Sequence, residues 1–215
     1  MRVFILCAGR CGSTTFIKAC KHIKNYTSSH ESLSRNYGQD RFNYPENHIE
    51  ADNRLSWHLG HLDGIFGDKP LYVHLKREKE KVAQSYLKRF YYSGSIMAAF
   101  CDGIRMLQKE ELSKEMQLQV CYDYIDTVDT NIIHFLSDKS NVLTIELENV
   151  KKDFPSFWKR VAAQGNLEEA MEEFEKKYNS SSKWNLSYPY RLKLMAIREW
   201  RYLVSYIKQN VIVDE

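Results

Sequence analysis

The chain opens with a short apolar run that passes directly into a glycine-containing polar loop. Every residue of Val3–Cys7 is apolar, and Gly9 follows one residue later. An unbroken apolar run of this length is typical of a strand that is buried on both faces of a parallel sheet. Apolar residues then recur at helical spacing within Ser13–Lys24. The sequence therefore predicts a strand, a tight loop and a helix, which is the opening unit of an α/β fold.

The remainder of the chain continues this alternation. Further strands are predicted at 25–29, 47–51, 71–75 and 142–145. Helices are predicted where apolar residues recur three and four apart, at 78–90, 112–136, 167–178 and 190–208. Residues 32–70 are polar, so a long loop region is expected there around one short strand, and a further loop is expected at 179–183. Alternating strands and helices predict a parallel sheet covered on both faces, within a single domain spanning 1–215.

Composition excludes several classes of protein. Lys and Arg together number 31 and Asp and Glu 28, a net charge of +3, which does not indicate a nucleic-acid-binding protein. No apolar run approaches the roughly 20 residues of a membrane-spanning helix. The five cysteines form no CxxC pair and no zinc-binding spacing, as expected of reduced thiols in a cytoplasmic protein.

The loop after the first strand carries several groups that bind anions. Gly9 and Gly12 allow the backbone to curve around a ligand, and Arg10 adds a guanidinium. Three hydroxyl residues, Ser13–Thr15, stand at the start of the predicted helix, where backbone amides and the helix dipole favour negative charge. The loop therefore predicts a phosphate-like ligand. The alternative is a plain strand, turn and helix with a Ser or Thr cap.

Two common phosphate-binding loops do not fit this segment. The nucleoside-triphosphate loop G-x-x-x-x-G-K-[ST], aligned on Gly12, requires glycine and lysine where the chain has Cys7 and Ser13. The missing lysine is the residue that reaches the terminal phosphates. The phosphatase pattern C-x5-R also fails, because Ser13 and Ile17 stand where it requires arginine. An ATPase or a phosphatase is therefore not expected.

Gly9-Arg10-Cys11-Gly12-Ser13-Thr14 resembles the 5′-phosphosulfate loop of the sulfotransferases that use 3′-phosphoadenosine 5′-phosphosulfate (PAPS). Cys11 stands where that family mostly has serine. The resemblance implies a three-layer α/β/α domain with a five-stranded parallel sheet, similar to P-loop kinases. It also implies that the donor nucleotide is bound by Arg10, Cys11, Gly12, Ser13, Thr14 and Thr15.

A second motif of the same family matches further along the chain. Arg77 follows the predicted strand at 71–75, and Ser85 lies eight residues later, at the interval of the family's 3′-phosphate motif. Glu78-Lys79 replaces the usual Asp-Pro. An arginine at the carboxyl end of a strand lies where open α/β sheets bind ligands. The alternative is a solvated charged helix. Together the two motifs predict a ligand with two separated anionic groups, as in PAPS.

The resemblance also implies the chemistry: sulfuryl transfer from PAPS to a hydroxyl by in-line displacement, without a metal ion. The family has a catalytic base shortly after the second strand, where this chain has His30-Glu31. Glu31 is favoured as the base and His30 is the second choice, whereas a plain first-turn glutamate is the alternative. Arg10 and the loop amides are expected to stabilise charge on the leaving oxygen.

Weaker candidates follow the third predicted strand. Arg54 and Trp57 are expected to contact the acceptor. A surface charge is an equal alternative for Arg54, and a place in the core is the alternative for Trp57, because most aromatic residues at such spacing are core residues. Asp52 there supports the main alternative function, a degenerate P-loop kinase. A catalytically inactive nucleotide-binding module is the third possibility. The expected partner is a small-molecule or carbohydrate hydroxyl acceptor, and the sequence does not indicate an oligomeric state.

Overall fold

The computed structural model describes residues 1–92, 94–176, 178, 196 and 200. Residues 1–179 form one compact unit and 180–215 a second. The loop expected at 179–183 and, apart from Ala196 and Trp200, the helix expected at 190–208 lie outside the described residues. A single domain spanning 1–215 stays a prediction.

A five-stranded sheet with strand order β2-β3-β1-β4-β5 forms the centre of this unit. Every neighbouring pair is parallel, which confirms the predicted five-stranded parallel sheet. β1 is central and fully buried because each of its four residues is apolar. The strand bounds are Val3–Leu6 (β1), Thr27–His30 (β2), His48–Ala51 (β3), Leu71–Lys76 (β4) and Val142–Glu146 (β5).

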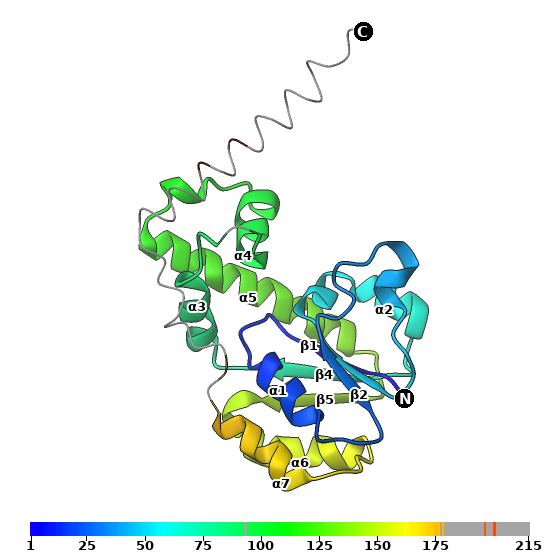
Figure 1. Cartoon of the computed structure of the whole chain (residues 1–215). Coiled ribbons are helices and arrows are strands. Elements are labelled where there is room, and N and C mark those ends of the chain that lie inside the picture. The colour runs from blue at the N-terminus through cyan, green and yellow to red at the C-terminus, as the bar shows by residue number, and fades with distance from the viewer. Residues whose placement is uncertain (93, 177, 179–195, 197–199, 201–215) are drawn as a thin grey trace. The chain divides into compact units, whose positions relative to one another are not determined.

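Helices cover both faces of the sheet, with α1, α6 and α7 on one face and α2 and α5 on the other (Figure 1). This arrangement is the predicted three-layer α/β/α architecture. Among the described residues, no helix combines the length and apolar character that crossing a membrane requires. The helix bounds are Ser13–Cys20 (α1), Leu59–Phe66 (α2), Lys79–Leu87 (α3), Ile96–Ala98 (α4), Lys114–Leu136 (α5), Val150–Arg160 (α6) and Leu167–Glu172 (α7).

Helix α2 lies in the segment that the sequence predicts to be loop. Gly60 and Gly64 within it are poor helix formers, so the local propensity of this segment is weak. Leu62 and Phe66 lie four residues apart on one side of the helix, and both are buried. Tertiary burial of this apolar pair therefore stabilises a helix that propensity alone does not indicate.

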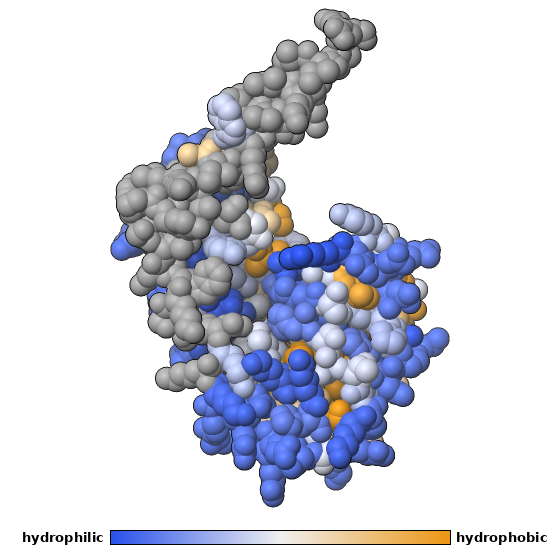
Figure 2. All heavy atoms as spheres, in the orientation of Figure 1, coloured by the Kyte–Doolittle hydropathy of each residue, from blue (hydrophilic) through white to orange (hydrophobic). Residues whose placement is uncertain are grey.

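Aromatic side chains hold the layers together. Phe16 of α1 packs edge-on against Phe154 and Phe157 of α6, with ring centroids 5.2 and 5.1 Å apart. On the other face, Phe4 of β1 packs against Phe66 of α2 at 5.1 Å. All five cysteines are buried. Hydrophilic residues predominate on the described part of the surface in Figure 2.

The strand order makes the chain reverse direction across the sheet at β1. From β1 the chain first builds β2 and β3 on one side, and then crosses to β4 and β5 on the other. The loops after β1 and β4 therefore leave neighbouring strands at the same carboxyl edge. In parallel α/β sheets this reversal point is where ligands bind.

Candidate anion-binding site

The loop after β1 has a left-handed backbone at three positions. Gly9, Arg10 and Gly12 have φ values of 82°, 59° and 85°. A side chain at Gly9 would overlap the Tyr86 hydroxyl, and a Cβ at Gly12 would lie 2.8 Å from the Leu147 side chain. The two glycines thus serve the packing of the loop as well as its curvature, a requirement that the sequence alone does not reveal.

Buried hydroxyl and thiol groups hold this loop from the protein interior. The hydroxyls of Tyr86 and Tyr124 both donate to the Ala8 carbonyl, at 2.6 and 2.8 Å. The thiol of Cys11 donates to the Gly9 carbonyl at 3.2 Å. A hydrogen bond with the Cys7 thiol and burial raise the pKa of Cys11 well above its usual value, so the thiol is neutral and faces inward. These contacts fix the loop without a ligand.

Helix α1 begins directly after the loop. Its N-cap is Gly12, which supplies no side-chain cap, and its first turn contains no acidic residue. Ser13, Thr14 and Thr15 are half-buried there. Backbone amides of a first helical turn lack intrahelical acceptors and carry the positive end of the helix dipole. This end of α1 therefore favours an anion that the first turn itself does not provide.

The structure brings together the residues of the two predicted motifs. The Arg10 side chain donates from Nε to the Ser85 hydroxyl at 3.0 Å. Arg77 donates from Nη1 to the backbone carbonyl of Arg10 at 3.1 Å. The Nε atom of Arg77 is buried and has no hydrogen-bond partner among the described residues. An unpaired buried donor is costly, so this atom indicates room for an acceptor from a ligand.

Positive charge is concentrated at this point. Burial lowers the pKa of Arg10, and the charges of Arg89 and Arg77 lower it further, outweighing Tyr86 and Cys11, which raise it. The charges of Arg89 and Arg77 therefore both act against the charge of Arg10, which is partly buried. A bound anion would relieve this repulsion. Sequence reasoning missed Arg89, although its position four residues after Ser85 on a helical segment is a signal for a shared face.

The two candidate bases have different partners. His30 lies 2.9 Å from the Ser13 hydroxyl through Nε2, and so contacts the predicted nucleotide loop. Glu31 has a left-handed backbone, with φ 53°. Its Oε2 atom forms an ion pair with Nη1 of Arg54 at 2.8 Å, and both side chains are about one-third exposed, at 33% and 36%. Glu31 and Arg54, predicted as base and acceptor contact, are thus paired at the carboxyl edge.

Both carboxylate oxygens of Asp52 are bound by other residues of the fold. The side chain is fully buried, and Arg41 binds Oδ2 at 2.5 Å. The backbone amide of Arg54 donates to Oδ1 at 2.8 Å. Burial raises the pKa of this carboxyl, with the charge of Arg41 opposing the effect. Because both oxygens are engaged, Asp52 is poorly placed to bind the magnesium ion that a kinase would require.

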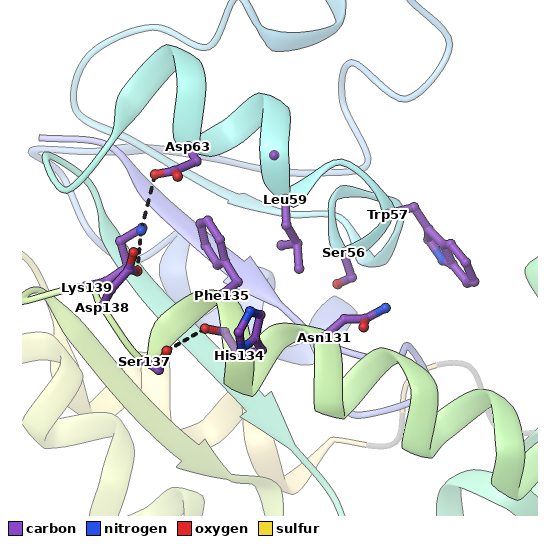
Figure 3. A pocket seen from close by; sticks show the side chains of 11 residues that line it. Ser56, Trp57, Leu59, Asp63, Asn131, His134, Phe135, Ser137, Asp138 and Lys139 are labelled. Carbon is purple, nitrogen blue, oxygen red and sulfur yellow. Dashed lines mark hydrogen bonds and ion pairs between the residues drawn. The ribbon is translucent and has the colours of Figure 1, made fainter.

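Trp57 packs among aromatic residues. Its ring stacks near Tyr124, with centroids 6.4 Å apart, and lies 6.3 Å from Phe100. Trp57 also borders a hollow of about 500 Å³ between α2 and α5, but its ring points away from that hollow (Figure 3). None of the residues predicted to bind the nucleotide lines it. The lining residues are Ser56, Trp57, Leu59, Gly60, Asp63, Asn131, His134, Phe135, Ser137, Asp138 and Lys139.

Comparison with known proteins gives distant likeness to solved structures alone. No protein-family model matches the chain, and no curated protein matches it. Among solved structures, the chain is similar to mouse sulfotransferase SULT7A1 complexed with PAP, at 14% sequence identity and a TM-score of 0.45. The similarity covers 87% of this chain and 68% of the mouse chain. A likeness this distant assigns neither a family nor a site.

Proposed function

We propose that this protein is a sulfotransferase that moves a sulfuryl group from PAPS to a hydroxyl acceptor. One observation carries the proposal: the loops after two neighbouring strands are joined, because the Arg10 side chain donates to Ser85 and Arg77 donates to the Arg10 backbone carbonyl. The start of α1, which has no side-chain cap, follows the same loop. The start of α1 and the Arg77–Ser85 region would then provide two anion-binding places at one edge of the sheet. A nucleotide with anionic groups at both its 3′ and 5′ positions matches such a pair.

The residues present suit each end of the donor. The first turn of α1, with Ser13, Thr14 and Thr15, would hold the 5′-phosphosulfate. Arg77 and Ser85 would hold the 3′-phosphate, and the buried Nε of Arg77 supplies a donor in need of an acceptor. The contact of Arg10 with Ser85 favours the 3′ side for its guanidinium. Its predicted role at the leaving oxygen and a direct contact from Cys11 stay predictions.

Glu31 is proposed as the general base. PAPS supplies an activated sulfuryl group, so the protein has to position the acceptor hydroxyl and remove its proton. Glu31 is one-third exposed at the sheet edge, and Arg54 fixes the direction of its carboxylate. His30 remains the second choice because it contacts Ser13. A small-molecule or carbohydrate acceptor, independence from metal ions and a cytoplasmic location stay predictions.

Measuring the turnover of PAPS tests both the proposed function and the identity of the general base. We expect PAPS to be converted to adenosine 3′,5′-bisphosphate in the presence of a mixed library of hydroxyl compounds. Glu31→Gln removes the proton acceptor but keeps the shape, so it should lower this rate by about 10²–10⁴-fold. His30→Asn is the matched variant at the neighbouring residue and should lower the rate less than about tenfold.

Other outcomes point to the alternatives. Consumption of ATP with Mg²⁺, and none of PAPS, would indicate the degenerate kinase instead. Equal and negligible rates for the wild type and Glu31→Gln, with the bisphosphate still bound, would indicate an inactive nucleotide-binding module. A larger loss in His30→Asn than in Glu31→Gln would transfer the role of base to His30.

A further inference from the structure

Two buried tyrosines hold a single carbonyl group of the loop after β1. The hydroxyl of Tyr86, on α3, donates to the Ala8 carbonyl at 2.6 Å, and that of Tyr124, on α5, donates to the same oxygen at 2.8 Å. A carbonyl oxygen has two lone pairs, so these two hydrogen bonds occupy both. Two helices that are distant in the sequence therefore fix the orientation of one peptide group.

The two tyrosine rings are themselves held in place. They pack edge-on with centroids 5.2 Å apart, and the ring of Tyr124 also packs edge-on against Phe100 at 5.3 Å. Both tyrosines are buried. Burial raises the pKa of both hydroxyls, so they remain protonated donors over the ordinary pH range. The Ala8 carbonyl is thus bound by a rigid, preformed pair of donors.

The amide on the other side of this peptide group belongs to Gly9. In a trans peptide the C=O and N–H bonds point in opposite directions, so the Gly9 amide is directed away from the tyrosine hydroxyls. Gly9 is buried, and its amide has no hydrogen-bond partner among the described residues. Buried amides are almost always paired. The Gly9 amide therefore indicates room for an acceptor from a ligand at this loop.

We infer that Tyr86 and Tyr124 are positioning residues, which orient the Gly9 amide toward the 5′ end of the donor nucleotide. The inference rests on the proposed function, because that function assigns the 5′-phosphosulfate to the start of α1, directly after the same loop. The two hydroxyls act through the Ala8–Gly9 peptide group rather than by touching the nucleotide. Their removal should therefore weaken the binding of a 5′-phosphate and leave the binding of a 3′-phosphate unchanged.

Calorimetric titration with two nucleotides tests this role. Adenosine 3′,5′-bisphosphate carries a 5′-phosphate and adenosine 3′-monophosphate lacks it. The double variant Tyr86→Phe/Tyr124→Phe keeps both rings and removes both hydroxyls. Its affinity for the bisphosphate should fall at least about tenfold, and its affinity for the monophosphate less than about twofold. Each single variant keeps one hydroxyl and should recover part of the loss.

Tyr72→Phe is the matched control. Tyr72 is also buried, and its hydroxyl also donates to a backbone carbonyl, that of Gly67, at 2.9 Å, but this bond lies outside the loop after β1. Because the same kind of hydrogen bond is lost, urea unfolding should show a loss of stability similar to that of Tyr86→Phe. Both nucleotide affinities of Tyr72→Phe should nevertheless stay within about twofold of the wild type.

The single variants and the wild type distinguish the possible failures. If circular dichroism shows that the double variant does not fold, the single variants decide, each with an expected loss of at least about threefold for the bisphosphate alone. Equal losses for both nucleotides, or no loss beyond that of Tyr72→Phe, would overturn the positioning role while leaving the proposed function standing. If the wild type does not bind the bisphosphate, the proposed function fails and this inference fails with it.

Discussion

At the scale of single residues, the loop after β1 combines backbone strain with close packing. Arg10 has φ 59° between two glycines that are also left-handed. A side chain with a Cβ adopts this conformation at a cost, and surrounding contacts have to maintain it. Here the Arg10 carbonyl accepts from Arg77 and the Ala8 carbonyl accepts from two tyrosines. From this left-handed position the Arg10 side chain donates to Ser85.

Gly9→Ala should destabilise the protein by about 1–3 kcal/mol, because φ is 82° and the new Cβ would overlap Tyr86 and lie 2.9 Å from Asn53 Nδ2. The matched control is Gly64→Ala in α2, where no atom lies within 4 Å of the added Cβ. That change should be neutral or stabilise by up to about 1 kcal/mol. Urea unfolding measures both, and equal effects would contradict the packing role of Gly9.

At the scale of elements, the edge strand β2 is held by a buried polar network. All four residues of β2 are polar, so apolar burial contributes little to its place in the sheet. Glu50 of β3 accepts from the amide and hydroxyl of Ser32, just past the strand, and from His48 at 3.0 Å. His48 in turn contacts the Thr27 hydroxyl at 2.7 Å. This network fixes the segment that carries Glu31.

The pH dependence of stability should report on Glu50. Burial raises the pKa of this carboxyl, but hydrogen bonds from His48 and Ser32 outweigh burial and lower it overall. The stabilisation is therefore fully present above the unfolded pKa of about 4.3 and is lost as pH falls through the lower folded value. Glu50→Gln should reduce stability at pH 7 by about 1–3 kcal/mol and flatten this acid dependence.

Chemical unfolding at a series of pH values between 7 and 3 measures this effect. Glu111→Gln, at an exposed glutamate, is the control and should retain the wild-type slope. An unchanged slope in Glu50→Gln would show that other carboxyl groups cause the acid sensitivity.

The elements differ in how far the sequence predicts them. β1, β4 and β5 were predictable because apolar and β-branched runs mark buried parallel strands. β2 is polar, so only its position after a helix indicated it. α2 was missed because its stability comes from burial of Leu62 and Phe66 rather than from propensity. Propensity and periodicity describe local preference, whereas these two elements depend on the sheet around them.

In the candidate site, too, some features could be predicted from the sequence and others depend on tertiary packing. The spacing of Arg77 and Ser85 could be read from the sequence, and so could the loop around Arg10. The direction of the Arg10 side chain could not, because it depends on how Ser85 and Tyr86 of α3 contact the loop after β1. The inward-facing thiol of Cys11 likewise follows from packing against Gly9 and Cys7.

At the scale of the whole described unit, the topology places the candidate functional residues at one edge of the sheet. The loops after β1, β2, β3 and β4 carry Arg10, Glu31, Arg54 and Arg77, and all leave the sheet at its carboxyl side. A net charge of +3 is small for the chain, yet Arg77 contacts the Arg10 backbone, and the charges of Arg77 and Arg89 both lower the pKa of Arg10. The local charge, and not the total, therefore indicates an anionic ligand.

The central claim is that Arg77 and the loop after β1 bind one nucleotide at both its ends, and calorimetry tests it most directly. Adenosine 3′,5′-bisphosphate should bind the wild type in the presence of EDTA. Arg77→Ala should weaken binding at least tenfold, because it removes a charge-assisted contact worth about 1.5–3 kcal/mol. Arg105→Ala, which removes an exposed arginine paired with Asp123, should bind as the wild type does. Tight binding of ATP with Mg²⁺ and none of the bisphosphate, or an Arg77→Ala variant that binds the bisphosphate normally, would contradict the claim.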